Sequence, residues 1–254
     1  MDSIQRVQVW KDTIHHCKKM NIMPSLSIKY TTRPKLQGTR SYENTNVIVV
    51  NEDCIEQALK YHMLNPVILN LADDSFPGGS VDVGSGAQEE SIFRRTDIYR
   101  TLNHQTGFYP LKNIDAIYSP LVHIIKNRDG SYKDTTYSIS VISVPGIRMP
   151  MLVNGHLTED DRILLEDKIR MILDIGLLHN HGVIVLGAIG CGAWRNPPED
   201  VAMCFKRVLP EYIGKFDTIA FAVLEVPQSD YLVRRNHSSG IKTNYTIFKE
   251  VLES

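Results

Sequence analysis

Residues 67–95 read VILNLADDSFPGGSVDVGSGAQEESIFRR, and this stretch decides the fold class. Its first five residues are apolar apart from one asparagine, which is typical of a strand buried on both faces of a sheet. A loop rich in glycine and acidic residues follows over 72–87, and the pattern then predicts a helix from about Gln88 with Ile92 and Leu102 on its buried side. A buried strand that passes through a glycine loop into a helix is the repeating unit of α/β proteins.

Strands and helices alternate in the same way on both sides of this stretch. Apolar patterns predict strands at 47–50, 116–125, 137–144, 183–186 and 218–226, and helices at 4–17, 54–64, 197–209 and 245–252, with a further long helix capped by Thr158. This alternation predicts an α/β domain whose mixed, mostly parallel sheet lies between helices. We expect one domain over 1–254, in which 1–44 forms an N-terminal helix and a polar arm.

Composition and charge narrow the class of protein. The chain has 254 residues, of which 43% are hydrophobic and 22% charged, a balance typical of a folded globular protein. Its 28 Lys and Arg residues against 29 Asp and Glu residues leave a net charge of −1, which argues against direct sequence-specific nucleic-acid binding. No apolar run approaches the ~18 residues of a membrane span, and no signal peptide is recognisable. We expect no membrane association, a cytoplasmic or nuclear location, and a monomer.

Neither a metal site nor a disulfide framework is predicted. The four cysteines form no CxxC pair, so we expect free thiols in a reducing compartment. The nine histidines form no cluster with zinc spacing, and no metal or cofactor is expected. Cys191 could act as a nucleophile in a helix-start loop, but no histidine is locally placed as its base. The doublets Arg94-Arg95 and Arg234-Arg235 are interpreted as solvated surface, and the second could touch polymer phosphates.

A second glycine loop follows the strand at 183–186 and reads GAIGCGAWRNPP over 187–198. In open α/β sheets, ligands bind beyond the carboxyl ends of strands, where glycines let the backbone approach a phosphate and helix starts offer unpaired N–H groups. Two such loops could hold a diphosphate between main-chain amides without Lys, Arg or a metal. No GxxxxGK[ST] motif occurs in the chain. The pattern therefore favours a phosphate-containing ligand over mobile surface turns.

Side chains beside the two loops leave several interpretations open. Glu89 and Glu90 suit the positive end of a helix, and they also suit acid–base work on a glycosidic bond, in which a carboxylic acid protonates the leaving oxygen. Trp194 could pack against a sugar or simply fill space in the core. Asp73 and Asp74 could accept a hydrogen bond from an adenine amine or cap the turn after the strand.

The first loop and the helix after it resemble a known family. PGGS at 77–80, seven further residues, QEE at 88–90 and RRTDIY at 94–99 resemble the signature of the bacterial-type poly(ADP-ribose) glycohydrolases, in which three glycines are followed after a short interval by Gln-Glu-Glu. This resemblance implies a macrodomain-like fold, that is, a three-layer α/β/α sandwich with a mixed sheet. The predicted N-terminal helix resembles the helical extension that such proteins often carry.

The later part of the chain extends the same resemblance. The second glycine loop is similar to the family's diphosphate-binding loop, and FAVLE at 221–225 with Asn244 and Phe248 is similar to its C-terminal end. The resemblance thus covers most of the chain from about residue 45 onward. It implies a hydrolase that cleaves O-glycosidic ribose bonds of poly(ADP-ribose) or protein-linked ADP-ribose and releases ADP-ribose. ADP-ribose, poly(ADP-ribose) and ADP-ribosylated proteins would be its partners, with no cofactor.

Matching positions carry the family's roles to this chain. Glu90 would be the catalytic acid, and Glu89 would hydrogen-bond ribose hydroxyls. The ligand-binding residues that the resemblance implies are Asn70, Gly78, Gly79, Ser80, Gln88, Gly190, Cys191, Gly192, Ala193, Trp194, Asn244 and Phe248. Gly190 to Ala193 would hold the diphosphate, while Asn244 and Phe248 would lie near the adenosine.

Ser80 departs from the family pattern, because it stands where the third glycine is expected. If this position needs a positive φ, a serine costs about 1 kcal/mol of strain; otherwise the loop follows a different path. Rival interpretations therefore stay open: an ADP-ribose-binding module without turnover, a mono-ADP-ribosyl hydrolase, or a nucleotide or phosphate-ester hydrolase. The lack of basic residues near either loop counts against the last of these.

Overall fold

The structure is a computed structural model that describes residues 1–36, 38, 41–102, 107–225 and 242–254. The strands of its main sheet are β1 Ile28–Tyr30, β2 Asn46–Val50, β3 Pro66–Leu71, β4 Ala116–Lys126, β5 Tyr132–Val144, β8 Val183–Leu186 and β9 Thr218–Ala222. They form one seven-stranded sheet in the order β1-β4-β5-β3-β8-β9-β2. A separate hairpin consists of β6 Leu152–Val153 and β7 His156–Leu157.

Most of the strand pairs in the sheet are parallel, as the alternation of strands and helices predicts. The pairs β5–β3, β3–β8, β8–β9 and β9–β2 are parallel, whereas β1–β4 and β4–β5 at one edge are antiparallel. β3 and β8 lie at the centre and are almost wholly buried, which agrees with their unbroken apolar sequences. Because they are parallel neighbours, the loops after them meet at the same edge of the sheet.

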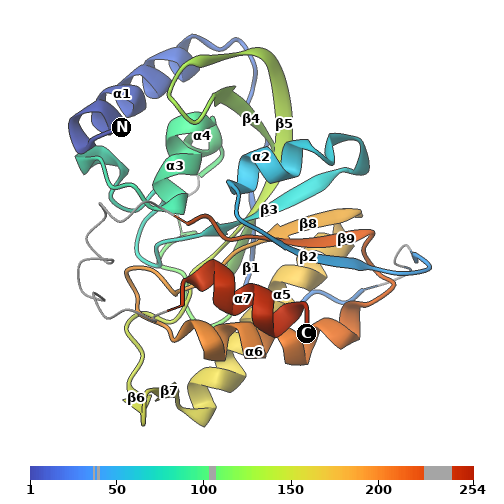
Figure 1. Ribbon diagram of the computed structural model, residues 1–254. Helices are drawn as coiled ribbons and strands as arrows, with labels where there is room; N and C mark the ends of the chain where they lie inside the picture. Colours follow the sequence, from blue (N-terminus) through green and yellow to red (C-terminus); the bar gives the residue numbers. More distant parts are fainter. Residues whose placement is uncertain (37, 39–40, 103–106, 226–241) are drawn as a thin grey trace.

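Helices cover both faces of the sheet and complete a three-layer sandwich (Figure 1). One face carries α1 Ser3–Lys19, α2 Cys54–Leu59, α3 Gln88–Arg95 and α4 Ile98–Leu102, and the other carries α5 Glu159–Leu178, α6 Pro198–Val208 and α7 Asn244–Leu252. Two predicted caps are present: the Asp53 side chain accepts the N–H groups of Ile55 and Glu56, and the Thr158 hydroxyl accepts the N–H of Asp161. The predicted three-layer α/β/α fold with an N-terminal helix is confirmed.

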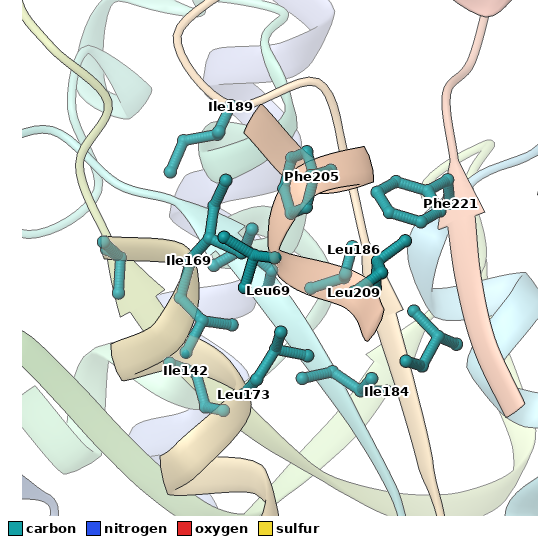
Figure 2. Close-up of a cluster of buried hydrophobic side chains, with 14 of the residues drawn as sticks. Leu69, Ile142, Ile169, Leu173, Ile184, Leu186, Ile189, Phe205, Leu209 and Phe221 are labelled. Atoms are coloured by element: carbon teal, nitrogen blue, oxygen red, sulfur yellow. The ribbon is translucent and has the colours of Figure 1, made fainter. Parts of the chain in front are cut away.

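Two hydrophobic cores lie between the layers, one on each face of the sheet. Figure 2 shows part of the core under α5 and α6, where Leu69 and Leu186 from the central strands pack against Ile169, Leu173 and Phe205. These side chains are almost fully buried, at 0–1% exposure. Truncating such a residue to alanine typically costs about 2–5 kcal/mol, so this core holds β3 and β8 firmly beneath the loops that follow them.

The structure departs from the sequence prediction at the helix that begins with Gln88. Instead of one helix, the chain forms α3 and α4, which are separated at Thr96 and Asp97. Thr96 makes an isolated β-bridge with Ile124, and its hydroxyl donates to the carbonyl of Ile92. This contact with the sheet turns the chain out of the helical path. The short edge strand β1 and the β6–β7 hairpin were not predicted either, and the predicted helix at 54–64 is α2 followed by a separate 3₁₀ turn at His62–Leu64.

The first arginine doublet is not solvated surface as the sequence suggested. Arg94 and Arg95 are 4% and 2% exposed. Arg95 pairs with Asp53 at 2.8 Å and with Glu56, and Arg94 donates to the carbonyl of Ser85 at 2.6 Å. Arg94 therefore links α3 to the loop before it, and Arg95 links α3 to the start of α2. The second doublet, Arg234-Arg235, lies outside the described residues. In the described part of the chain, no helix is both long enough and apolar enough to cross a membrane.

Candidate active site

A cleft of about 350 Å³ lies between the two glycine loops, at the carboxyl ends of β3 and β8. We call residues 72–87 loop 1 and residues 187–197 loop 2. The cleft is lined by Leu71, Ala72, Asp73, Gly79, Ser80, Ser85, Ala87, Gln88, Glu89, Glu90, Gly146, Arg148, Met149, Ala188, Gly190, Gly192, Ala193 and Trp194. The predicted acidic pair, part of loop 1 and most of the predicted loop 2 residues therefore come together around one cavity.

Gln88 fixes the start of α3 against the central strand. Its Oε1 accepts the N–H of Leu71 at 2.8 Å, and its Nε2 donates to the carbonyl of Leu69 at 2.7 Å. β8 pairs with β3 only as far as Ile68, so the Gln88 amide takes the place of a neighbouring strand for the next main-chain groups. Although Gln88 lines the cleft, both ends of its amide serve the strand. Its observed role is to position α3.

Glu89 joins loop 1 to the end of β3. Its Oε1 accepts the Asn70 amide and the N–H of Gly78, each at 3.2 Å, and its Oε2 accepts the N–H of Asp73 at 2.7 Å. Glu89 is 4% exposed, and this burial raises its pKa to about 7, although its three hydrogen-bond donors favour the ionised form. Glu89 thus holds the main chain of loop 1 through hydrogen bonds, and it also lines the cleft.

Glu90 has one carboxyl oxygen engaged and one without a partner. Oε1 accepts the N–H of Ser80 at 3.1 Å. Oε2 is buried and has no hydrogen-bond partner among the described residues. Leaving a buried carboxyl oxygen unpaired is costly, and Glu90 lines the cleft. The arrangement therefore suits a carboxyl group whose second oxygen meets a bound ligand.

Gly79 lets both carboxyl groups approach the loop. Its φ is +51°, in the left-handed region that glycine adopts readily. A Cβ at this position would lie 2.8 Å from Oε1 of Glu90 and 3.1 Å from Oε2 of Glu89. Gly78 is constrained from the other side, because its φ is +85° and a Cβ would lie 2.7 Å from the ring of Phe93. The two glycines are therefore required by close approach, as the sequence pattern suggests.

Loop 2 lines the cleft and contains main-chain N–H groups that have no acceptor in the part of the protein that the structure describes. Within the described residues, the amides of Gly190, Gly192, Ala193 and Trp194 donate to no protein acceptor, and all four residues line the cleft. The loop is tightly packed, because a Cβ at Gly190 would lie 2.6 Å from the Asn196 side chain. A group of unpaired N–H donors in a tightly packed loop suits an anion such as a phosphate.

Comparison with known proteins finds a family to which part of this chain is similar. The family model of the microbial-type PARG catalytic domain matches residues 5–127, which include loop 1 and the QEE segment. This segment is similar to that family, and it makes up 123 of the 254 residues. The predicted resemblance to the bacterial poly(ADP-ribose) glycohydrolases is confirmed. No curated protein matches the chain.

Solved structures of bacterial PARGs share the fold over nearly the whole chain. The PARG of Thermomonospora curvata superposes with a TM-score of 0.81 at 21% identity, covering 97% of this chain and 99% of that one. The same enzyme bound to the inhibitor ADP-HPD gives a TM-score of 0.76 at 22% identity, with 97% and 98% covered. The PARG of Deinococcus radiodurans in complex with ADP-ribose gives 0.67 at 21% identity, with 100% and 93% covered.

Ser80, which replaces the third glycine of the PARG signature, adopts an ordinary backbone conformation. Its φ is −97° and its ψ is 35°, outside the left-handed region. The strain considered for a serine at this position is therefore absent. The contact that matters at the cleft is the main-chain N–H of Ser80 with Glu90, and any residue except proline can supply that group.

Several residues that the PARG resemblance implied as ligand contacts lie outside the cleft lining. Asn70 is fully buried behind Glu89, and Gly78 is buried under Phe93. Cys191 lies on loop 2, where burial raises the pKa of its thiol, which argues further against a nucleophilic role.

The two C-terminal candidates also lie apart from the cleft lining. Phe248 is 0% exposed, with its ring centroid 6.0 Å from that of Phe221 and 6.2 Å from that of Phe205. It is a core residue, and its packing leaves no surface for an adenosine in this structure. Asn244 is half-buried at the first position of α7 and does not line the cleft. Their similarity to the family's C-terminal end reflects the packing of α7.

Sequence reasoning missed Arg148, which the fold brings into the cleft. Its guanidinium group pairs with Asp73 at 3.0 Å and with Asp74 at 2.5 Å, and it stacks on the Trp194 ring at 4.5 Å. The loops were expected to have no basic residue near them, and this expectation was wrong. Asp73 also accepts the N–H of Ser75, so both acidic residues stabilise the turn and the arginine. Only tertiary packing brings Arg148 to this position.

Proposed function

We propose that this protein is a poly(ADP-ribose) glycohydrolase, which cleaves O-glycosidic ribose bonds of poly(ADP-ribose) or protein-linked ADP-ribose and releases ADP-ribose. The observation that carries the proposal is the buried Oε2 of Glu90, which has no partner among the described residues and belongs to a side chain that lines the cleft. An oxygen of the scissile glycosidic bond would supply the missing partner. The match to the microbial PARG catalytic domain and the ADP-ribose and ADP-HPD complexes of similar structures support this assignment.

Glu90 acts as the general acid in this mechanism. Because Oε1 already accepts the N–H of Ser80, the carboxyl proton is favoured on Oε2. This proton passes to the leaving ribosyl oxygen as the bond to the anomeric carbon breaks and that carbon develops positive charge. Water then attacks the carbon and gives up a proton to the Glu90 carboxylate, which restores the acid. The products are free ADP-ribose and a shortened polymer or a released acceptor. The step needs no metal, since a protonated carboxyl group supplies the acid.

Glu89 and loop 2 orient the substrate. Oε2 of Glu89 accepts one N–H in the protein, and a carboxylate oxygen can accept a second hydrogen bond, here from a ribose hydroxyl. The free amides of Gly190, Gly192 and Ala193 suit the diphosphate of the same ADP-ribose unit. The diphosphate would then be held on one side of the cleft while the reacting bond lies against Glu90 on the other.

The partners of this activity would be ADP-ribose, poly(ADP-ribose) and ADP-ribosylated proteins. We propose that residues 1–254 act together as one domain, because strands from both halves of the chain join the same sheet. The monomeric state and the intracellular location that we expect from the sequence stay predictions.

The decisive experiment measures ADP-ribose release from an automodified, poly(ADP-ribose)-bearing substrate. Wild-type protein is compared with Glu90→Gln and Glu90→Ala, and ADP-ribose binding is measured by calorimetry on the same samples. Removing a general acid typically costs about 10²- to 10⁴-fold in rate. We expect losses in this range for both variants, with ADP-ribose binding retained.

Glu199→Gln is the matched control, because Glu199 is an exposed glutamate in the first turn of another helix, α6, outside the cleft. It should leave ADP-ribose release unchanged. A wild-type protein that binds ADP-ribose but releases none would contradict the hydrolase and favour a binding module. Release from mono-ADP-ribosylated protein but not from polymer would instead identify a mono-ADP-ribosyl hydrolase.

A further inference from the structure

Arg148 bridges the two loops that border the cleft. It lies between β5 and the β6–β7 hairpin and reaches loop 1, where its Nε donates to Asp74 at 2.9 Å and its Nη2 donates to Asp73 at 3.0 Å. The flat face of its guanidinium lies over the Trp194 ring of loop 2, with 4.5 Å between the guanidinium carbon and the ring centroid. One side chain thus contacts both sides of the cavity.

The backbone around Arg148 is fixed to loop 2. The N–H of Met149 donates to the carbonyl of Trp194 at 3.1 Å, and the buried Asn196 amide donates to the carbonyl of Ile147 at 2.6 Å. Gly146 packs so closely on Gly190 that a Cβ on Gly146 would lie 2.7 Å from the Gly190 Cα. Arg148 is therefore held next to the loop whose unpaired amides face the cleft.

The charged side chains that line the cavity are mostly acidic. The carboxyl groups of Asp73, Glu89 and Glu90 line the cleft, and Arg148 is the one Lys or Arg in its lining among the described residues. A diphosphate carries negative charge and would be repelled by these carboxylates if only neutral amides opposed them. Arg148 is therefore the side chain in this lining that can add positive charge for an anion that binds beside the acidic residues.

The guanidinium group of Arg148 is partly exposed and has a nitrogen that could donate to an anion. The Arg148 side chain is 45% exposed. Nε and Nη2 donate to the aspartates, while Nη1 donates to no acceptor in the described part of the chain. Arginine presents its donors in a planar fork that suits phosphate oxygens, and the stack on Trp194 restricts that plane.

We propose that Arg148 is a phosphate-binding residue of the cleft, which contacts the diphosphate of the ligand through Nη1 while Asp73 and Asp74 hold the rest of its fork. This inference rests on the proposed function, and it adds a charged, side-chain component to a site that otherwise offers main-chain amides. Trp194 then serves as the platform that orients Arg148 rather than as a contact for a sugar.

The test compares binding of ADP-ribose with binding of adenosine, which lacks the diphosphate. Arg148→Met keeps an unbranched apolar side chain on Trp194 but removes the charge. It should weaken ADP-ribose binding by about 10- to 100-fold, the usual value of one or two charge-assisted hydrogen bonds, and leave adenosine binding nearly unchanged. Arg148→Lys should recover part of the loss, because it restores the charge without the fork.

Arg207→Met is the matched control: Arg207 is 46% exposed and pairs with Glu166 on α5, away from the cleft. It removes the same charge and should leave both affinities unchanged. Equal ADP-ribose affinity in wild type and Arg148→Met overturns the inference alone. Parallel loss of adenosine and ADP-ribose binding in both Arg148 variants overturns it in favour of a purely structural bridge. A wild-type protein that binds neither ligand overturns the proposed function as well.

Discussion

The main-chain N–H of Ser80 donates to Oε1 of Glu90 at 3.1 Å, and Oε2 of the same carboxyl group is buried without a partner among the described residues. In the proposed mechanism, this contact leaves Oε2 to carry the proton that is transferred. Ser80 makes the contact through its backbone, so the identity of the side chain at position 80 matters less than the presence of the N–H. This separates Ser80 from Gly79, whose missing Cβ is itself required.

Ser80→Pro removes the N–H that holds Glu90. We expect the rate of ADP-ribose release to fall by about 10- to 100-fold, which corresponds to the ~1.5–3 kcal/mol of a hydrogen bond to a charged group. Ser80→Gly keeps the N–H and should retain far more activity than the proline variant. Single-turnover measurements of both proteins check this, and equal losses in the two would show that the serine hydroxyl is the important group.

Gly79→Ala places a methyl group 2.8 Å from Oε1 of Glu90 at a φ of +51°. The displaced carboxyl should cost about 100-fold or more in kcat. Gly155→Ala is the control, because Gly155 also has a positive φ, +84°, but a Cβ there meets nothing within 4 Å. Both variants should lose about 1 kcal/mol of stability from backbone strain. If Gly155→Ala lost activity equally, strain and not Glu90 would explain the effect.

His181 should make the folded state sensitive to acid. It is 2% exposed, its Nδ1 donates to the carbonyl of Asn65 at 2.7 Å, and its Nε2 accepts the Tyr118 hydroxyl at 3.0 Å. Burial lowers its pKa from 6.5 to about 4. The stability that neutral His181 contributes is present above about pH 6.5 and is lost as the pH falls through about 4. Urea unfolding should show the advantage of wild type over His181→Gln shrinking by up to ~3 kcal/mol across this range; a constant difference would argue against a buried neutral histidine.

Glu89 should act with the opposite sign in nearly the same range. Burial raises its pKa from 4.5 to about 7, so its favourable contribution is complete below about pH 4.5 and is lost as the pH rises through about 7. The free energy of unfolding of wild type minus that of Glu89→Gln should therefore decrease by up to ~3 kcal/mol between about pH 4.5 and about pH 8. A difference that increased with pH would mean that the hydrogen bonds from Asn70, Gly78 and Asp73 outweigh burial.

Trp10 links the N-terminal helix to loop 1. Its indole N–H donates to Asp82 at 2.6 Å, and Trp10 is 6% exposed. Trp10→Phe keeps most of the ring packing but leaves the Asp82 carboxylate without this donor. We expect a loss of about 1–3 kcal/mol in the free energy of unfolding, measured by denaturant titration. If Asp82→Asn, which can still accept the indole N–H, destabilised the protein as much, the hydrogen bond would not be the cause.

The sequence was most informative where local pattern and tertiary structure agree. The apolar runs predicted β3 and β8, because a strand buried on both faces must be apolar along its whole length. The run at 47–50 predicted β2 as well, although this strand lies at the edge of the sheet and is mostly half-buried. The acidic pair and the glycine loops could be placed together because parallel neighbouring strands end at one edge of a sheet. These inferences depend on contacts between residues close in sequence or on adjacent strands.

The sequence failed where long-range packing decides the outcome. Arg148 has no local motif, and it reaches the cleft because Gly146 packs on Gly190. Thr96 breaks the predicted helix because it bridges to Ile124 on another strand. Phe248 was assigned to the ligand by resemblance, yet it fills the core beside Phe221. In each case a partner distant in the sequence determines the position, and no periodicity records that partner.

The two hydrogen bonds between the Gln88 amide and the main chain of β3 have a consequence for how such proteins can change. The amide holds the first residue of α3 directly against the strand, and Glu90 follows two positions later in the same helix. A change in the length of loop 1 would leave these two hydrogen bonds of Gln88 in place, whereas the contacts of Gly79 and Ser80 with Glu90 depend on the loop itself. The start of α3 is thus anchored to the sheet independently of the loop that precedes it.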